Sequence, residues 1–112
     1  MSRYQEGLAG EDLAADYLQQ LGFSIITRRY RSRAGEVDLI ARQGQVVHFV
    51  EVKYRPKGRL GMGLKAVTPD KRRRLKLTAR HYLANHPSPY RISCLEITRA
   101  GVWFCPDILH QI

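Results

Sequence analysis

The sequence predicts a mixed α+β domain, a sheet flanked by helices in the order α-β-β-β-α-β-β, and three observations lead to it. The first is an apolar periodicity of helical spacing over residues 8–21, followed by Gly22, a residue type common just after a helix. The second is a set of short runs rich in Val, Ile and Phe, bounded by turn residues. The third is Thr68-Pro69-Asp70, which resembles a helix start and lies between the third and fourth runs.

The predicted elements follow one another along the chain. The first helix carries its apolar residues at Leu8, Leu13, Ala14, Tyr17, Leu18 and Leu21. Three strands then form an antiparallel meander whose second turn is placed at Gln43 and Gly44. A second helix extends from the Thr68 cap to about residue 85, and a crossover of this length permits a parallel strand after it without requiring one. The predicted strands are 23–31, 36–42, 46–54, 91–98 and 101–105.

The chain is basic, and its basic residues are concentrated in one segment. The 112 residues carry a formal net charge of +9, and their number suits a single domain, 1–112, with one core. Between Lys53 and Arg80 stand eleven of the 19 Lys and Arg residues but only one acid, Asp70. Such a local concentration of positive charge favours a polyanion or an acidic surface as the partner.

The sequence also bears on location. Its first twenty residues are charged and amphipathic, unlike a signal peptide, and no apolar run reaches the length of a membrane span. We therefore expect a cytoplasmic protein that does not enter a membrane. Cys94 and Cys105 fit this expectation as small buried thiols, and they lack the neighbouring Cys or His residues that a zinc site requires.

Two predicted strands carry charges within an apolar pattern. Because side chains alternate along a strand, Glu51 and Lys53 share one face, and Glu36 and Asp38 share the corresponding face of the preceding strand. A two-residue turn would set Glu36 opposite Glu51, whereas a four-residue loop would set Asp38 there. In both registers the carboxylates converge on the face of Lys53. The opposite face of the earlier strand is expected to hold Val37, Leu39 and Ala41.

These charged residues suit a divalent metal. Neighbouring carboxylates repel one another, and their pKa values rise unless a cation lies between them. Mg²⁺ accepts one or two protein carboxylates and completes its coordination with water and phosphate oxygens. A nearby lysine can hold the attacking water or stabilise charge on the phosphate, so Asp38, Glu51 and Lys53 suit phosphodiester hydrolysis. A solvated charge ladder is the alternative, since Glu-x-Lys alone is weak support for catalysis.

Five segments, taken in order, resemble one family. They are GEDLAADYLQQLGF, RRYR, GEVDLIA, FVEVKYR and AVTPDKRRRL, which with the second helix span about residues 10–83. Through this series the chain resembles the YraN-type bacterial family of predicted endonucleases, within the PD-(D/E)xK nuclease superfamily, and is similar to archaeal Holliday-junction resolvases. The resemblance implies a restriction-endonuclease-like core.

The resemblance also implies roles for individual residues. Asp38 and Glu51 match the metal ligands of the superfamily, and Lys53 matches its catalytic lysine. Glu11 matches a glutamate on the first helix that approaches the metal, although the helix dipole alone favours an acid in a first turn. The implied cofactor is Mg²⁺, with Mn²⁺ as a substitute. Glu36 has no matching role and is expected to support the site from outside.

Three positions depart from the family pattern. Val37 stands in place of proline, which leaves the chemistry of the neighbouring aspartate intact. Arg29 stands where YraN-type sequences usually have asparagine. Ile92-Ser93 replaces Phe-Asp after Arg91, so any support that this aspartate gives the active site in relatives is in doubt here.

The basic segment is predicted to bind nucleic acid. Flexible Lys and Arg side chains and the backbone N–H groups of a helix start both suit phosphate oxygens. Such contacts follow the shape of the backbone and carry no base code, and we expect DNA in preference to RNA. A solubilising charged surface is the alternative. The predicted contact residues are Arg55, Lys57, Arg59, Lys65, Lys71, Arg72, Arg73 and Arg74.

Three functions are therefore open. The preferred one is a Mg-dependent endodeoxyribonuclease that selects branched, flap or single-strand-containing DNA. The second is a noncatalytic nucleic-acid-binding module that keeps the nuclease fold, and the third is an adaptor for an acidic protein. Junction-cutting relatives act as dimers, which makes a homodimer a further expectation, with the apolar residues 102–104 as its interface.

Overall fold

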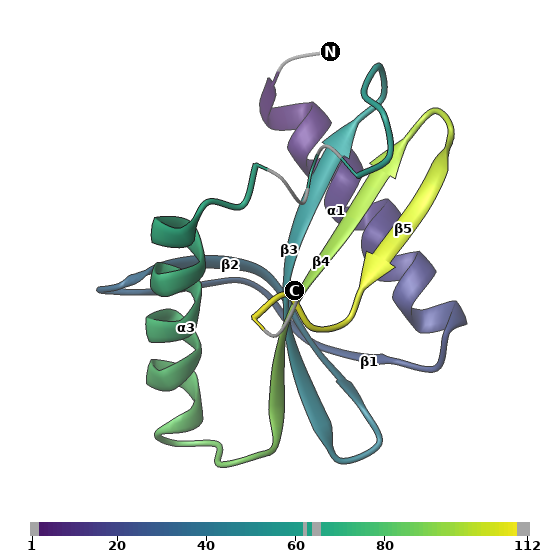
Figure 1. The fold of residues 1–112 in the computed structure, drawn as a ribbon. Helices are drawn as coiled ribbons and strands as arrows, with labels where there is room; N and C mark the ends of the chain where they lie inside the picture. The colour runs from purple at the N-terminus through teal and green to yellow at the C-terminus, as the bar shows by residue number, and fades with distance from the viewer. Residues whose placement is uncertain (1–2, 62, 64–65, 110–112) are drawn as a thin grey trace.

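Two helices and five strands build the molecule in the predicted order (Figure 1). We analysed a computed structural model that describes residues 3–61, 63 and 66–109. The mixed α+β class and the order α-β-β-β-α-β-β are confirmed. The elements are α1 Arg3–Gln20, β1 Ser24–Ser32, β2 Gly35–Gln43, β3 Val46–Arg55, α3 Pro69–Leu83, β4 Tyr90–Thr98 and β5 Gly101–Cys105.

The five strands form one mixed sheet in sequence order, β1-β2-β3-β4-β5. Neighbouring strands are antiparallel except β3 and β4, which run parallel with Glu51 paired to Cys94 and Lys53 paired to Glu96. The connection between the parallel strands passes through α3. The sequence left open whether the fourth strand runs parallel to the third, and in the structure it does.

The turn between β2 and β3 lies one residue later than predicted. Gln43 pairs with Val46, so the two turn residues are Gly44 and Gln45, and Gly44 has the left-handed φ of 60° that glycine adopts readily. The resulting register is the one in which Asp38 lies across from Glu51. The ladder between the strands ends at Leu39 and Val50, just before that pair.

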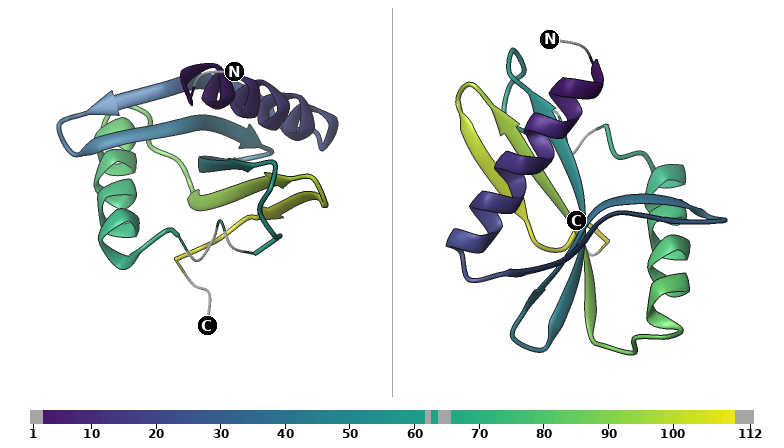
Figure 2. Two further views of the ribbon diagram at one scale, coloured as in Figure 1. Left: turned by 90° about the horizontal axis from the view of Figure 1, so that it is seen from above. Right: turned by 180° about the vertical axis from the view of Figure 1, so that it is seen from behind.

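Each helix covers one face of the sheet (Figure 2). On the α1 side, Ala14 and Leu18 pack against a cluster that includes Leu39 and Val50. On the α3 side, a second cluster joins Leu75, Ala79 and Tyr82 of the helix to strand residues such as Phe49. The two apolar clusters therefore fix the helices on opposite sides of β3, the strand that carries Glu51 and Lys53.

The buried stripe of α1 differs from the predicted one. Ala14 and Leu18 are buried as expected, but Leu13 and Leu21 are 47% and 45% exposed. The helix turns its small residues to the sheet, and a Cβ atom on Gly10 would lie 2.6 Å from the Cβ atom of Tyr54. This close approach of α1 to β3 selects a small residue at the contact and leaves Leu13 on the exposed side of the helix.

The start of α3 agrees with its sequence signal. Thr68 has extended backbone angles, and its hydroxyl accepts a hydrogen bond from the Lys71 N–H at 3.2 Å. Pro69 occupies the first turn, where its missing N–H leaves no helical bond unmade. Both cysteines are free and buried on adjacent strands, as expected of small thiols. None of the described helices is long and apolar enough to cross a membrane.

Candidate metal centre

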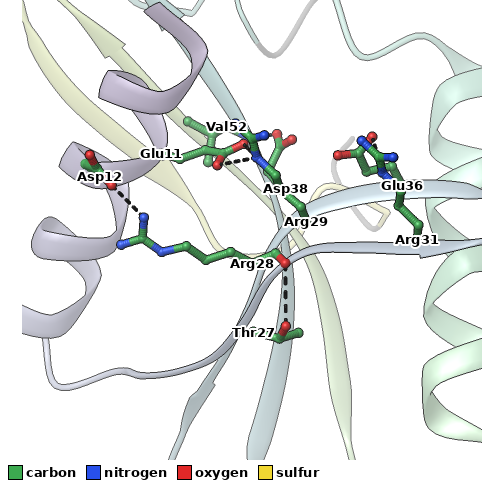
Figure 3. Close-up of polar contacts among 9 residues, drawn as sticks. All are labelled: Glu11, Asp12, Thr27, Arg28, Arg29, Arg31, Glu36, Asp38 and Val52. Atoms are coloured by element: carbon green, nitrogen blue, oxygen red, sulfur yellow. Dashed lines mark hydrogen bonds and ion pairs between the residues drawn. The ribbon is translucent and has the colours of Figure 1, made fainter. Parts of the chain in front are cut away.

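Asp38 is held at the point where β2 separates from β3. The ladder between the two strands stops at Leu39, and the Val52 N–H donates to Asp38 Oδ2 at 2.7 Å instead of to a backbone carbonyl (Figure 3). The carboxylate thereby satisfies a backbone group of β3 that the departing strand would leave without a partner. This bond fixes Asp38 beside the segment of β3 that carries Glu51 and Lys53.

The alternation of side chains breaks at the same point. Leu39 and Ala41 lie in the cluster under α1, but Val37 belongs to the cluster under α3, contrary to the predicted common face. The part of β2 before Leu39 pairs only with β1. The twist that is usual in sheets shifts the side chains of this part relative to those of the part that also pairs with β3. Asp38 stands between Val37 and Leu39, at the changeover.

Glu51 projects from β3 into a nearly closed position between two lysines. Its side chain is 8% exposed, and its Oε1 atom lies 3.2 Å from Lys53 Nζ and 2.5 Å from Lys71 Nζ. Lys53 comes from the same face of β3, as alternation predicts, whereas Lys71 comes from the first turn of α3. The predicted pair of Glu51 and Lys53 is therefore joined by a third charged residue from another element.

The electrostatics of the centre depend on burial and on these neighbours. Burial, together with the Glu51 carboxylate, raises the pKa of Asp38 from its ordinary 3.8 to about 7, although the Val52 hydrogen bond lowers it. Burial and the nearby Lys71 lower the pKa of Lys53, against the attraction of Glu51. Burial lowers the pKa of Lys71, but its side-chain hydrogen bonds and the charges of Glu51 and Asp38 together outweigh burial, and the pKa is raised.

Glu11 approaches the centre from α1 and is held by an arginine. Both of its oxygens accept from Arg29 Nε, at 2.9 and 3.2 Å (Figure 3). Its charge contributes to the raised pKa of Asp38, so the two carboxyl groups are near one another. Arg29 adopts a left-handed φ of 54°, a conformation that asparagine tolerates better than arginine.

A pocket of about 310 Å³ opens beside the acidic groups. Helix α1 and strands β2 and β3 line it, with Glu11, Asp38 and Lys53 among the lining side chains and Arg55 at its rim. A second pocket of about 280 Å³ lies between the β1–β2 hairpin and α3, lined by Gly35, Glu36, Lys71, Arg74 and Leu75. Glu36 thus faces this second pocket, where it also pairs with Arg31 at 3.6 Å.

The donor set fits a hard divalent ion held by two carboxylates. Asp38 and Glu51 come from adjacent strands, and burial together with the Glu51 charge raises the pKa of Asp38, a conflict that a bound cation would relieve. Within residues 3–61, 63 and 66–109, no three His, Cys, Asp or Glu side chains are grouped closely enough to hold a metal. A pair of carboxylates suits Mg²⁺, which completes its coordination with water and phosphate.

The predicted nucleic-acid contacts fall into different environments. Arg55, Lys57 and Arg59 are exposed at the end of β3 and on the loop that follows. Arg72 is turned inward and donates to the carbonyls of Val67 and Ile108 at 3.0 and 2.8 Å. Lys71 forms an ion pair with Glu51, and Arg73 and Arg74 both pair with Asp70. Lys65 lies outside the described residues.

Ser93 does not reach the candidate centre. Its hydroxyl lies 2.8 Å from His48 Nδ1 and donates to the Pro106 carbonyl at 2.6 Å. Burial lowers the pKa of His48, which points away from Glu51 as the strand alternation predicts. The departure from aspartate at this position therefore affects a buried polar contact on the other face of the sheet.

Sequence reasoning missed a second buried glutamate. Glu96 on β4 is fully buried, and its two oxygens accept from the Gly61 and Gly63 N–H groups at 2.7 and 2.9 Å. It pairs in register with Lys53, so it ties the loop after β3 to the sheet beside the candidate centre. Glu96 lies in a strand pattern of apolar residues, and this contrast is the signal that could have found it.

Comparisons with known proteins identify the family of this chain. Residues 10–100 match the model of a family described as "Uncharacterised protein family UPF0102". A UPF0102 protein of Mycolicibacterium vanbaalenii is 41% identical over 111 residues, 97% of this chain and 92% of the relative. One from Symbiobacterium thermophilum is 47% identical over 100 residues, 87% and 84% of the two chains, and one from Lachnoclostridium phytofermentans is 42% identical over 94 residues, 84% and 80%. The resemblance to the YraN-type family is confirmed, and the chain belongs to the uncharacterised family UPF0102.

Proposed function

We propose that the protein is a Mg²⁺-dependent endonuclease that hydrolyses phosphodiester bonds in branched, flap or single-strand-containing DNA. One observation carries the proposal: burial and the Glu51 charge on the adjacent strand raise the pKa of Asp38, and Asp38 lines one pocket together with Lys53, the ion-pair partner of Glu51. A carboxylate with a perturbed pKa near a lysine in a pocket is typical of sites for metal-assisted hydrolysis.

The residues of the centre take different parts in this proposal. Asp38 and Glu51 would hold the ion, which when bound polarises the phosphoryl group and lowers the pKa of a water molecule. Lys53, whose Nζ lies 3.2 Å from Glu51, is placed to hold the attacking water or to stabilise charge on the phosphate. Glu11 approaches Asp38 from α1 and would assist it. Arg29 orients Glu11 by donating to both of the glutamate's carboxylate oxygens.

DNA would approach along the exposed basic residues at the pocket rim. Arg55 borders the pocket, and Lys57 and Arg59 follow it on the exposed loop. Contacts of this type bind phosphates without reading bases, which fits selection by DNA shape, and we propose DNA in preference to RNA. Binding should therefore weaken steeply as the salt concentration rises.

Cleavage assays with matched variants test the proposal. Branched, flap and linear DNA are incubated with the protein and Mg²⁺ or Mn²⁺, beside Asp38→Asn, Glu51→Gln and the control Glu36→Gln, which removes an exposed carboxylate outside the centre. We expect the first two variants to lose cleavage by about a thousandfold while DNA binding is kept, and the control to retain both. Cleavage that survives Glu51→Gln would contradict the proposal.

A noncatalytic nucleic-acid-binding module is the second candidate. Its support is that Lys53 and Lys71 already neutralise Glu51, so the buried charge is compensated by the protein's own side chains. This candidate predicts salt-dependent DNA binding by wild-type protein with no metal-dependent cleavage of any of the DNA structures. The same assays therefore separate the two candidates.

Location and assembly belong to the proposal as well. Two free thiols suit a reducing compartment, and we propose the cytoplasm, where DNA is also available to a bacterial protein. A homodimer would form along β5, an edge strand on which Val102 and Trp103 are 38% and 37% exposed. Sedimentation of wild-type protein and Trp103→Lys tests this, because the substitution should favour a monomer.

A further inference from the structure

Helix α3 delivers a lysine into the candidate metal centre from its first turn. Lys71 Nζ lies 2.5 Å from Glu51 Oε1, and its side chain is 33% exposed. The same oxygen is 3.2 Å from Lys53 Nζ. Two ammonium groups, from a helix and a strand that are far apart in the sequence, therefore share one oxygen of a carboxylate that is almost closed to solvent.

The ammonium group of Lys71 acts on both proposed metal ligands. Attraction by Glu51 and Asp38 supports the charged state of Lys71, and Lys71 in turn lowers the pKa of Asp38. Its positive charge is therefore where a divalent ion bound by the same two carboxylates would be. Glu51 Oε1 already accepts from the ammonium groups of Lys53 and Lys71, which occupy both of its lone pairs. Mg²⁺ that binds this oxygen at about 2.0–2.1 Å must therefore displace one of the two.

We infer that Lys71 occupies the cation position of this centre and competes with the divalent ion for Glu51. The inference rests on the proposed function, because it requires Asp38 and Glu51 to be the metal ligands. Metal binding then demands that the Lys71 side chain leave Glu51, which a flexible four-carbon stem permits while α3 stays in place. The centre therefore has a low metal affinity until Lys71 is drawn away.

The second pocket is the place to which Lys71 can turn. Lys71 lines this pocket together with Arg74, so an anion entering it would meet two cationic side chains of α3. A phosphate of a bound nucleic-acid strand has the chemistry to occupy it. Because ligand couplings are reciprocal, a phosphate that binds Lys71 would raise the affinity of Glu51 for the metal. Substrate binding would thus prepare the centre for its ion.

A fixed ion pair is the competing explanation of this contact. In that case Lys71 only neutralises Glu51, and its removal affects metal binding through the loss of one positive charge from the helix. Lys76 provides a matched control for the charge, since it is a half-buried lysine on the same helix, and the ion pairs of Glu51 are with Lys53 and Lys71. Substitution of either lysine by methionine keeps the length of the side chain and removes the charge.

The test measures Mn²⁺ binding to the full-length chain by isothermal titration in the absence of DNA. The proteins are wild type, Lys71→Met, Lys71→Arg, Lys76→Met and the double variant Lys71→Met/Glu51→Gln, with circular dichroism as the check of folding. We expect Lys71→Met to tighten the Kd about tenfold or more, whereas Lys76→Met changes it less than about twofold because a more distant charge is screened. Lys71→Arg should bind as weakly as wild type, and the double variant should lose the gain.

The outcomes separate the inference from the proposed function. A Kd for Lys71→Met equal to that of Lys76→Met, or weaker than that of wild type, overturns the competition while leaving the metal site in place. Absence of Mn²⁺ binding in every folded variant, Lys71→Met included, overturns the metal site and the competition with it. If Lys71→Met does not fold, Lys71→Gln replaces it, since its amide can still donate to Glu51 without a charge.

Discussion

Two glutamates on adjacent strands are compensated in opposite ways. Glu96 on β4 is fully buried, and backbone N–H groups of Gly61 and Gly63 satisfy both its oxygens. Glu51 on β3 is nearly as buried, but its partners are the side chains of Lys53 and Lys71. Backbone donors cannot leave without moving the chain, whereas lysine side chains can rotate away. The comparison assigns Glu96 to structure and leaves Glu51 able to exchange its cations.

The largest expected effect is the difference in unfolding free energy between the Glu96→Gln and Glu51→Gln variants. Glu96→Gln would turn a donor group toward one of two backbone N–H groups, and leaving that donor unsatisfied should cost roughly 2–3 kcal/mol of unfolding free energy. Glu51→Gln should cost about 1 kcal/mol or less, since the two lysines can reach solvent, yet it should abolish metal binding. Urea unfolding and Mn²⁺ titration of both variants measure this. A greater loss of stability in Glu51→Gln would reverse the assignment.

The backbone hydrogen bonds that hold Glu96 can be tested by a substitution at Gly63. A Cβ atom there would lie 2.9 Å from Lys53 Cβ and 3.0 Å from Glu96 Cδ, so the loop must shift to accommodate it. We expect Gly63→Ala to cost about 1–3 kcal/mol of unfolding free energy through overpacking. Gly7→Ala is the control, because nothing lies within 4 Å of its added Cβ and alanine favours a helix by about 0.5–1 kcal/mol. Equal effects of the two substitutions would show that the Glu96 contact does not constrain the loop.

The different partners of the two glutamates also show what the sequence could predict. Alternation along β3 placed Glu51 beside Lys53, and the order of the elements followed from local periodicity and from the Thr68-Pro69 signal. Lys71 was predicted as a DNA contact because it opens a basic helix. Its contact with Glu51 depends on where the first turn of α3 meets the sheet, which is a property of the packed fold.

Errors in the predicted packing have the same origin. The burial of α1 depends on how closely the helix approaches Tyr54, so the small residue Gly10 faces the sheet and Leu13 does not. Val37 lies on the other face of the sheet because the part of β2 before Leu39 does not pair with β3. Neither event is encoded in the pattern of one element alone, since both arise where two elements meet. The partners of Glu96 come from a loop without periodicity and were missed for the same reason.

A third prediction concerns the ionisation of Asp38 in the absence of a metal ion. The pKa of Asp38 is about 7 in the folded protein and 3.8 ordinarily, so between these values the folded state binds more protons than the unfolded state. Stability of the metal-free wild type should therefore fall as the pH rises from about 4 to 7. In Asp38→Asn this loss is absent, and the variant should gain roughly 1–3 kcal/mol relative to wild type over the window.

Unfolding in urea with a chelator, at several pH values, measures this gain. Asparagine keeps an oxygen that can accept from the Val52 N–H, so the hydrogen bond itself is not the variable. Glu36→Gln serves as the control, because this exposed carboxylate should leave the pH dependence unchanged. Parallel profiles for wild type and Asp38→Asn would mean that neither burial nor the Glu51 charge raises the pKa of Asp38, and the contrast with Glu96 would lose its electrostatic part.

The smallest expected effect lies at Arg29, where backbone strain and an ion pair oppose each other. Its left-handed φ of 54° costs a non-glycine residue about 1 kcal/mol, while its Nε atom binds both oxygens of the buried Glu11. Arg29→Asn should relieve part of the strain and lose the pair, with a net change within about 1 kcal/mol. Arg29→Ala loses the pair but keeps the strain, so it should be less stable than Arg29→Asn by about 0.5–1 kcal/mol. If the two variants unfold at the same urea concentration, the left-handed backbone angle does not favour asparagine over alanine at this position.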